Sequence, residues 1–334
     1  MDRQFSVEFP DMSLRPSASA NPVTVDRAAS DETRTRAADD VRAQEGPAQI
    51  VSRVLGNLIE QRIDDWNVDG PNLWFMRLQA HLWSVLCDHY FRVEIHGWHR
   101  LPQEPCLLVG NHSGGQLTMD AWTLVAEWWR RFEERRILHG TAHDVLMSLP
   151  VLGDYFRLAG VIPASRAGVS AALQAGHDVV VWPGGEVEVT RSWRRRDKVV
   201  LGGHKGFIRQ AIREHVPIVP VATVGGHDTV FVLAEGQWLA DAVDRMFGLK
   251  KVLRAQALPL VFGPPFGLML EILPLHIPLP AKIRTDLLEP LRLDEDPERA
   301  NDEQYVDRMY GEVEDRIQDG MDRLARRRSF PILG

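Results

Sequence analysis

The sequence predicts an α/β domain with a mostly parallel central sheet flanked by helices. Between residues 90 and 225, short apolar runs that are typical of buried strands alternate with longer segments of helical periodicity. Strands separated by helices of this length form βαβ units, in which neighbouring strands are parallel. Helical patterns on either side of this region add an N-terminal helical hairpin and a C-terminal helix to the prediction.

Residues 1–47 are predicted to form a disordered tail. They are rich in Ser, Ala, Thr, Asp and Arg, with almost no large apolar side chain after Val25. A segment of this composition buries too little apolar surface to offset the entropy lost on ordering. Residues 48–330 are then expected to form a single domain, because a chain of 334 residues can bury one large core.

Two helices are expected at the start of this domain, within residues 48–89. Apolar residues recur at helical spacing over residues 50–59, and again over residues 73–86 after the turn NVDGPN. The second pattern is apolar on more than one face and contains Trp74 and Trp83. Two interpretations stay open: the helices pack against the core, or they dock on a bilayer, whose interface favours Trp and Leu with flanking Arg and Lys.

The middle of the chain predicts the strands and helices of the sheet. Because the carboxyl ends of parallel strands carry most of the chemistry in such folds, the residues just past each strand are the first candidates for a site. The strands are predicted at residues 90–98, 106–111, 136–142, 178–185 and 217–225, and the helices at residues 121–134, 168–176 and 204–215.

The last third of the chain begins with a predicted helix after Gly236. Residues 258–282 are apolar but interrupted by six prolines, so they cannot form one helix. A packed, irregular segment and a membrane-dipping loop both stay open for this stretch. Apolar residues at helical spacing between Val306 and Leu324 then predict the C-terminal helix.

The composition narrows the classes of function. Apolar residues make up 44% of the chain, charged residues 25%, and the formal net charge is −7. Nucleic-acid-binding domains usually carry a basic surplus, so no nucleic-acid partner is expected. Cys87 and Cys106 lack CxxC spacing, which predicts no metal site and no disulfide framework and favours a reducing compartment. No apolar run reaches the roughly 18 residues of a membrane-spanning helix, and the acidic start lacks the apolar core of a secretory signal.

Residues 107–120, LLVGNHSGGQLTMD, carry the strongest chemical pattern. A buried strand ends at Asn111 and His112, and Asp120 follows at the start of a predicted helix. Histidine suits proton abstraction at neutral pH because its ordinary pKa is about 6.5, and a carboxylate can hold one tautomer of its ring. A histidine at a strand end is more often a plain surface residue, but its neighbours here favour a base at His112 oriented by Asp120. Glycines allow close backbone approach and offer N–H donors to an oxyanion, so the predicted substrate contacts in this segment are Asn111, Ser113, Gly114 and Gly115.

Further blocks follow in an order that is seen in one enzyme superfamily. GVIPASR spans residues 160–166, VVWPGGEVEVTRS spans residues 180–192, and VPIVPVA spans residues 216–222. Together with the His-to-Asp block, this order resembles the glycerolipid acyltransferase superfamily, the group of the lysophosphatidic acid acyltransferases. Within it, the chain is most similar to the branch that resembles monoacylglycerol acyltransferases. The resemblance covers residues 70–225, about half of the chain.

Two positions differ from the pattern of the superfamily. Seven residues separate His112 from Asp120, where the superfamily usually has a shorter spacing. Either the Ser-Gly-Gly turn loops out and Asp120 keeps its role, or another group orients the histidine. Gly184 stands where most relatives have a glutamate, with Glu186 and Glu188 close behind, which weakens a phosphate-binding role for this block.

The resemblance implies an acyl-CoA-dependent O-acyltransferase with no bound cofactor or metal ion, acyl-CoA being a co-substrate. His112, held by Asp120, would take the proton of an acceptor hydroxyl, which attacks the thioester directly. Arg166, with Arg191 or Lys205, would bind an anionic group of CoA or of a phosphorylated acceptor, because a guanidinium donates two parallel hydrogen bonds to phosphate. The other substrate-binding residues implied by the resemblance are Gly160, Gly184, Gly185 and Glu186.

The expected partners are acyl-CoA, a lipid acceptor and a membrane surface, and the expected location is cytoplasmic, peripheral on the inner face of a membrane. The acceptor stays open among lysophosphatidic acid, glycerol 3-phosphate, acylglycerols and glycolipids. The basic run RSWRRRDK, residues 191–198, is predicted to be a solvated loop, with contact to anionic headgroups as the alternative. Four histidines without convincing partners are expected to be structural or surface groups: His177, His204, His215 and His227.

Two other functions compete with acyl transfer. A serine hydrolase would share the fold class and the ester chemistry, but its GxSxG pentapeptide does not occur in the sequence. A non-catalytic lipid-binding or scaffold protein with a degenerate acyltransferase fold is favoured by Gly184 and disfavoured by the intact Asn111 and His112. Replacing His112 separates enzyme from scaffold, because only an enzyme needs this side chain.

Overall fold

The computed structural model describes residues 64–247, 257–271 and 276–328, together with Arg53, Asn57, Arg62 and Phe330. The predicted tail at residues 1–47 lies outside these residues, and so does almost all of the first predicted helix at residues 50–59. Within residues 48–334, the described part consists of a central sheet and the elements around it.

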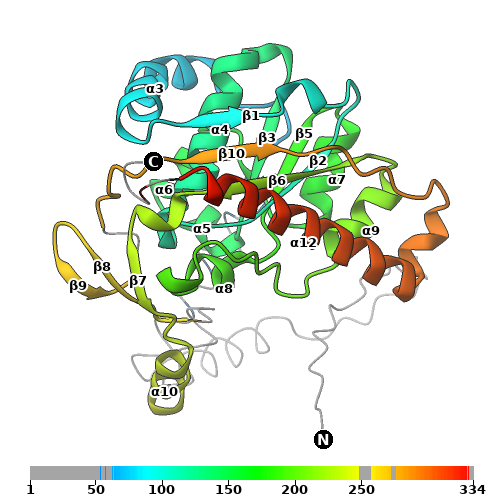
Figure 1. Ribbon diagram of the computed structural model, residues 1–334. Helices are drawn as coiled ribbons and strands as arrows, with labels where there is room; N and C mark the ends of the chain where they lie inside the picture. Colours follow the sequence, from blue (N-terminus) through cyan, green and yellow to red (C-terminus); the bar gives the residue numbers. More distant parts are fainter. Residues whose placement is uncertain are drawn as a thin grey trace, which may run out of the picture. The chain divides into compact units, whose positions relative to one another are not determined.

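Seven strands form the central sheet, in the order β1–β10–β6–β2–β5–β3–β4 (Figure 1). The five strands from β6 to β4 are parallel, whereas β10 runs antiparallel to β6, and β1 runs parallel to β10. The prediction of a mostly parallel sheet is confirmed, and β10 adds an antiparallel strand that the sequence pattern did not predict. The strands are β1 (Glu94–His96), β2 (Leu107–Gly110), β3 (Leu138–Ala142), β4 (Ile162–Pro163), β5 (Asp178–Val181), β6 (Ile218–Val224) and β10 (Arg284–Leu287).

Helices cover both faces of this sheet, as predicted. The described helices are α3 (Leu73–Val85), α4 (Met119–Phe132), α5 (Asp144–Ser148), α6 (Leu152–Leu158), α7 (Arg166–Gln174), α8 (Gly185–Val189), α9 (Gly206–Arg213), α10 (Gln237–Phe247) and α12 (Glu303–Arg326).

The central strand β2 is buried on both faces, which explains its unbroken apolar sequence. Leu107 and Val109 point to one side and join a cluster with side chains of α7, α9 and α12. Leu108 points to the other side and packs with Leu124 and Trp128 of α4. This alternation follows from the pleat of a strand, and each such side chain contributes about 1.5–3 kcal/mol when fully buried.

The predicted C-terminal helix is α12, which lies across one face of the sheet (Figure 1). Asp302 caps its start by accepting the N–H of Tyr305 at 3.1 Å. Its apolar side faces β6, and a Cβ atom at Gly320 would lie only 2.6 Å from the Cβ of Ala222. Glycine at this position therefore allows the close approach of helix and strand.

A second, three-stranded antiparallel sheet follows β6, in the order β7–β8–β9. Its strands are β7 (Phe231–Ala234), β8 (Leu260–Gly263) and β9 (Gly267–Leu270). The expectation of an irregular segment at residues 258–282 is therefore wrong for this part. The prolines are confined to the turn and the flanks, so LVFG and GLML keep every backbone N–H available for pairing.

The second of the two predicted N-terminal helices is α3. Asn72 caps it by accepting the N–H of Phe75 at 3.0 Å. Met76 is buried, whereas Trp74, Leu78 and Leu82 are exposed at helical spacing. Among the described residues, no helix is both long enough and apolar enough to cross a bilayer.

Candidate active site

The candidate site lies at the carboxyl edge of the parallel strands, where the loops after β2, β5 and β6 meet. His112 follows β2, Trp182 follows β5, and His227 follows β6. The imidazole of His112 stacks on the indole of Trp182, with ring centroids 4.9 Å apart and planes inclined by 15°. Because β5 and β6 are the two neighbours of β2, the strand order itself brings these loops together.

Asp120 is the carboxylate partner of His112 in spite of the long spacing. Its Oδ2 atom lies 2.9 Å from Nδ1 of His112, and its Oδ1 atom accepts the backbone N–H of Ser113 at 3.0 Å. The intervening residues loop out in a 3-10 turn, Gly115–Leu117, entered through Gly114 with φ of 96°. Of the two arrangements left open by the spacing, the structure therefore has the one in which the turn loops out.

The hydrogen bonds of Asp120 determine the tautomer of His112. An ionised carboxylate only accepts, so Nδ1 of the imidazole carries the hydrogen and donates it to Oδ2. This leaves Nε2 unprotonated in the neutral ring and able to accept a proton. The Asp120 side chain is 1% exposed and that of His112 is 15% exposed, so the pair is shielded while the ring keeps some access.

The backbone of His112 is held on both sides by residues that follow β5. Its N–H donates to Oε2 of Glu188 at 2.7 Å, and its carbonyl accepts from Nη1 of Arg191 at 2.6 Å. The other oxygen of Glu188 accepts the N–H of Val200 at 2.9 Å. Burial raises the pKa of Glu188 to about 7, although the Arg191 guanidinium opposes this rise. This clamp fixes the loop that carries the histidine.

The guanidinium of Arg191 is occupied by contacts within the protein. Its side chain is 1% exposed, and its guanidinium donates to the carbonyls of Glu188, Arg195 and Arg196 besides that of His112. These contacts correct the anion-binding role expected for Arg191: the guanidinium positions the backbone around His112. The basic run at residues 191–198 is thus only partly a solvated loop.

His227 completes this network and is buried. Its Nδ1 atom accepts the N–H of Gly114 at 3.1 Å, so its Nε2–H donates to the carbonyl of Arg191 at 3.0 Å. Burial lowers the pKa of His227 well below its ordinary value, which keeps the ring neutral. The sequence predicts a structural or surface role for His227, and the signal for a place at the site is its position just past the strand next to β2.

Asn111 and Ser113 contact protein groups. The amide of Asn111 pairs with the backbone of Thr223 on β6, accepting its N–H at 2.7 Å and donating to its carbonyl at 3.0 Å. The hydroxyl of Ser113 is buried and has no hydrogen-bond partner among the described residues. A Cβ atom at Gly226 would lie 2.1 Å from this hydroxyl. Asn111 thus joins the two strands behind His112, and Ser113 is packed beneath the turn.

A second buried carboxylate–imidazole pair contacts the turn at residues 115–117. Oε2 of Glu271 accepts the N–H of Gln116 at 3.3 Å, and its Oε1 accepts from Nδ1 of His276. Gly115 has φ of 63°, and a Cβ atom there would lie 2.8 Å from Glu271 Oε2, so a side chain at this position would displace the carboxylate. Neither Glu271 nor His276 was among the predicted site residues, because the segment between β7 and β10 matches no motif.

The third block is repacked around Gly184. A Cβ atom there would lie 2.0 Å from the carbonyl oxygen of Val200 and 2.5 Å from Glu188 Oε2, so no larger residue fits. Gly185 begins α8 with φ of 48°, and Glu186 accepts the N–H of Ala257 at 3.3 Å. The carboxylate of Glu188 therefore fills the space beside Gly184 and binds the His112 loop.

The remaining predicted site residues lie apart from the His112–Asp120 pair. Gly160 is buried with φ of 78°, and a Cβ atom there would lie 2.9 Å from the backbone nitrogen of Pro71, which indicates a packing role. Lys205 precedes α9 and forms an ion pair with Asp307 of α12. Arg166 is exposed in the first turn of α7, and within the described part of the chain no ion pair holds its guanidinium.

Part of the chain resembles a known protein family. The Acyltransferase family model matches residues 92–224, from just before β1 to the end of β6. An uncharacterized protein of Mycobacterium tuberculosis is 29% identical over 247 residues, 73% of this chain and 65% of the relative. Human diacylglycerol O-acyltransferase 2 is 26% identical over 186 residues, 52% of this chain and 47% of that protein. Together these similarities support a place in the glycerolipid acyltransferase superfamily.

Two other proteins are similar to a large part of this chain. A chicken protein named DGAT1/2-independent enzyme synthesizing storage lipids is 25% identical over 247 residues, 73% of this chain and 66% of the relative. The crystal structure of the 1-acyl-sn-glycerophosphate acyltransferase PlsC from Thermotoga maritima matches 77% of this chain and 80% of its own, with a TM-score of 0.45 and 17% identity. The chain spans 65% of the length of the mycobacterial relative. His227 and Glu271 lie beyond the segment that the family model matches.

Proposed function

We propose that this superfamily member transfers a fatty acyl group from acyl-CoA to a hydroxyl of a glycerol-based lipid, with His112 as the general base. The observation that carries the proposal is the contact of His112 with the buried carboxylate of Asp120. That contact holds Nδ1 and leaves Nε2 to accept a proton. The acyltransferase name of the human relative and the lipid-synthesizing name of the chicken relative support the reaction class.

The proposed reaction needs no covalent intermediate. Nε2 of His112 takes the proton of the acceptor hydroxyl as the oxygen attacks the carbonyl carbon of the thioester. The tetrahedral intermediate then collapses, the C–S bond breaks, and the imidazolium returns the proton to the departing CoA sulfur. Asp120 stabilises the imidazolium between these steps, and the contacts of Glu188 and Arg191 keep the loop from moving.

The side chains that could compete as nucleophiles are poorly placed. The Ser113 hydroxyl is buried, and no hydrogen bond joins it to His112 among the described residues. Cys87 and Cys106 are buried, and burial raises the pKa of the Cys87 thiol to about 12 and that of Cys106 well above its ordinary value. Direct attack by the acceptor is therefore the mechanism that this site supports best.

Arg166 is proposed to bind an anionic group of the donor or of a phosphorylated acceptor. It lies in the first turn of α7, whose N-terminal end carries partial positive charge and faces the same sheet edge as His112. Its exposed guanidinium is available, unlike that of Arg191. Lys205 also lies at the start of a helix, but Asp307 already pairs with its ammonium.

We further propose that the protein lies on the cytoplasmic face of a membrane through α3. Trp74 is 71% exposed on this helix, and Leu78 and Leu82 continue the same exposed side at intervals of one turn. Trp and Leu on one side of a surface helix are typical of interfacial association. The lipid acceptor would then reach His112 from the bilayer on which the domain lies.

The test compares wild type with His112→Ala by release of free thiol from the donor. The purified full chain is incubated with a long-chain acyl-CoA, or with the same acyl chain on acyl carrier protein, and with vesicles that contain one candidate acceptor each. Acceptor-dependent release by wild type, absent in the variant, supports the proposal and identifies donor and acceptor.

Equal release by both proteins, or none with any donor and acceptor, would overturn it. The second result would favour the non-catalytic lipid-binding alternative, for which the repacked Gly184 block is the supporting observation.

A further inference from the structure

The β8–β9 hairpin has an unusual composition for an exposed element. Residues 257–270, ALPLVFGPPFGLML, contain no charged side chain. In the antiparallel register, Val261 pairs with Met269, and these two side chains face the small core beneath the sheet. One apolar side is therefore accounted for by packing.

The opposite side of the hairpin is apolar as well. Phe262 is 51% exposed, Leu268 is 60% exposed, and Leu270 and Leu233 of β7 are exposed beside them. Strands of an antiparallel sheet that face water usually alternate apolar and polar residues. Here that alternation is absent, so the outer side is not adapted to water. Exposed apolar surface of this extent indicates an interaction site.

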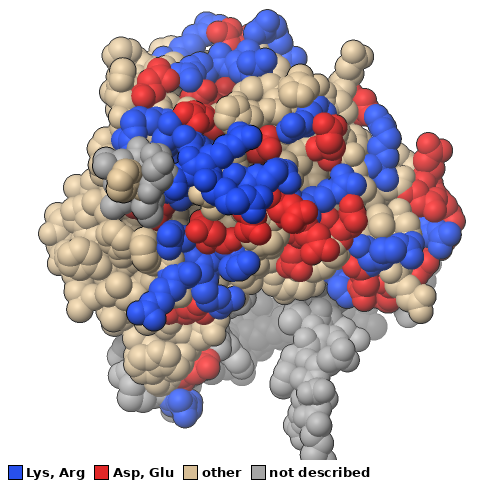
Figure 2. Space-filling view, viewed as in Figure 1, with Lys and Arg blue, Asp and Glu red and all other residues tan. Residues whose placement is uncertain are grey.

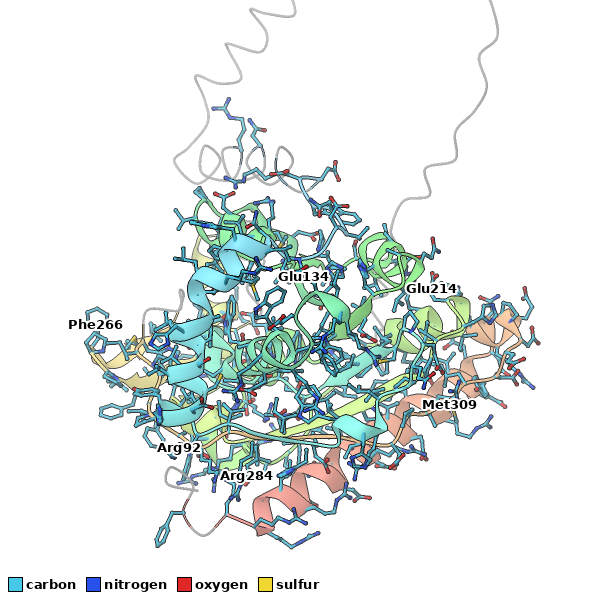
Figure 3. The ribbon with its side chains drawn as sticks, turned by 90° about the horizontal axis from the view of Figure 1, so that it is seen from above. Arg92, Glu134, Glu214, Phe266, Arg284 and Met309 are labelled. Atoms are coloured by element: carbon cyan, nitrogen blue, oxygen red, sulfur yellow. The ribbon has the colours of Figure 1, made fainter. Side chains whose placement is uncertain are left out.

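The tip of the hairpin projects from the domain. Phe266 at the turn is 65% exposed, and Figure 3 shows it pointing outward on the side of the molecule where α3 lies. Figure 1 also places α3 and the hairpin on one side of the domain, the side toward which the carboxyl ends of the parallel strands point. Figure 2 shows no charged side chains over the hairpin, whereas Lys and Arg gather over neighbouring parts of the surface.

We propose that the β8–β9 hairpin inserts into the surface of an anionic lipid bilayer, as a second attachment point beside α3. The inference rests on the proposed function in that the acceptor lipid is drawn from this bilayer. Hairpin and helix are separated elements on one side of the domain, and a flat apolar phase can contact both at once. His112 lies at the same edge, so insertion would bring the site to the membrane surface.

The turn is suited to an apolar medium. Pro264 and Pro265 have no backbone N–H, and the carbonyl of Pro264 accepts the N–H of Ile277 at 2.7 Å. Fewer backbone groups therefore lose hydrogen bonds to water on insertion. This argument distinguishes the tip from an ordinary exposed loop, whose N–H groups need water.

A basic segment beside the sheet complements anionic headgroups. Trp193 contacts Phe231 of β7, with ring centroids 5.6 Å apart, which places the basic run next to the small sheet. Arg194 and Lys198 of that run are exposed. Each such charge near an anionic surface contributes attraction that salt weakens. An apolar tip with a basic neighbour therefore fits an anionic bilayer better than a neutral one.

The test is cosedimentation of the full chain with vesicles of phosphatidylcholine, alone or mixed with phosphatidylglycerol, without any acyl donor. The variant Phe266→Glu/Leu268→Glu places two charges on the hairpin. The matched control Ala175→Glu/Gln304→Glu adds the same charge at exposed positions, at the end of α7 and in the first turn of α12. Both positions lie on the far side of the domain, where Figure 3 labels Glu214 and Met309, because Gln174 of α7 donates to Glu214 at 2.9 Å.

We expect the hairpin variant to bind anionic vesicles at least about tenfold more weakly than wild type, and the control to stay within about twofold. A nitroxide label at Phe266→Cys, selective because both native cysteines are buried, should become more accessible to oxygen and less accessible to a nickel chelate on binding.

Equal binding by the hairpin variant and wild type, or a label that stays in water, would overturn the inference. Conversion of a wild-type dimer to a monomer by the hairpin variant, with vesicle binding unchanged, would show that a second copy covers this surface. The assay needs no turnover, so hairpin-dependent binding by a protein without acyl transfer would contradict the proposed function alone.

Discussion

Asp120→Asn tests the proposed role of the His112 tautomer. The Ser113 N–H can only donate, so the amide oxygen of asparagine must stay at the Oδ1 position, where it accepts at 3.0 Å in the wild type. The NH₂ group then occupies the Oδ2 position and donates to Nδ1 of His112. The ring must carry its hydrogen on Nε2, and a protonated Nε2 cannot act as a base.

The expected loss is large because it concerns the reacting nitrogen. In a Ser-His-Asp triad, the same change from carboxylate to amide lowers kcat by about 10⁴. We expect a loss of about 10³–10⁴ in kcat here, or about 4–5.5 kcal/mol in the activation barrier. Both hydrogen bonds survive with one reversed, so the free energy of unfolding should change by only about 1 kcal/mol, including the lost charge at the start of α4.

Asp120→Ala is the comparison that separates stability from catalysis. It leaves the buried Ser113 N–H without an acceptor, which costs about 1–3 kcal/mol of unfolding free energy. Steady-state rates and urea unfolding of both variants would be measured, with ¹⁵N NMR of the imidazole to identify the protonated nitrogen. An asparagine variant that keeps more than about a tenth of wild-type kcat, or keeps the hydrogen on Nδ1, would refute the reasoning.

Three further predictions concern the surroundings of the pair. The pKa of Glu188 is about 7 instead of the ordinary 4.5, so the folded protein binds more protons between these values, and the unfolding free energy should fall as pH rises through them, by up to about 3 kcal/mol. Urea unfolding of the wild type from pH 4.5 to 8 should show this fall in unfolding free energy, and Glu188→Gln should lack it. The same dependence on pH in both proteins would contradict the prediction. Gly184→Ala should lower the unfolding free energy by about 1–3 kcal/mol because of the Val200 carbonyl, whereas Gly206→Ala, with nothing within 4 Å of its Cβ, should be neutral or stabilising; equal melting temperatures would count against the packing argument. Arg166→Ala should raise the KM of an anionic substrate by about tenfold with kcat little changed, and Arg213→Ala, which removes an exposed arginine at the C-terminal end of α9, should not; equal effects of the two would remove Arg166 from the site.

The family pattern and the contacts around Gly184 lead to different conclusions about whether the third block, residues 180–192, is degenerate. The missing glutamate favours a degenerate site when only the sequence is considered. In the structure, the carboxylate of Glu188 occupies the neighbouring space and holds the N–H of His112. The block is therefore packed around the loop that carries His112, and the anion-binding role is proposed for Arg166.

The sequence by itself determined the central architecture and the place of His112 at the end of a strand. Apolar runs of strand length alternating with helical patterns predict a parallel sheet, because this periodicity is local and survives without tertiary contacts. The same locality placed His112 at a strand end, and the glycines after it predicted a turn. The sequence did not predict the strands within residues 258–282, because a hairpin with two apolar sides lacks the alternation of apolar and polar residues that indicates a strand.

Only the tertiary structure decided which groups surround His112. Glu188 lies 76 positions away in the chain, Arg191 79 positions from His112, and His227 113 positions from Gly114. A buried arginine that binds carbonyls and an exposed one that is free to bind phosphate are the same letter in a sequence. Burial and the pairing of donors with acceptors distinguish Arg191 from Arg166, and both properties arise only when β2, β5 and β6 lie side by side.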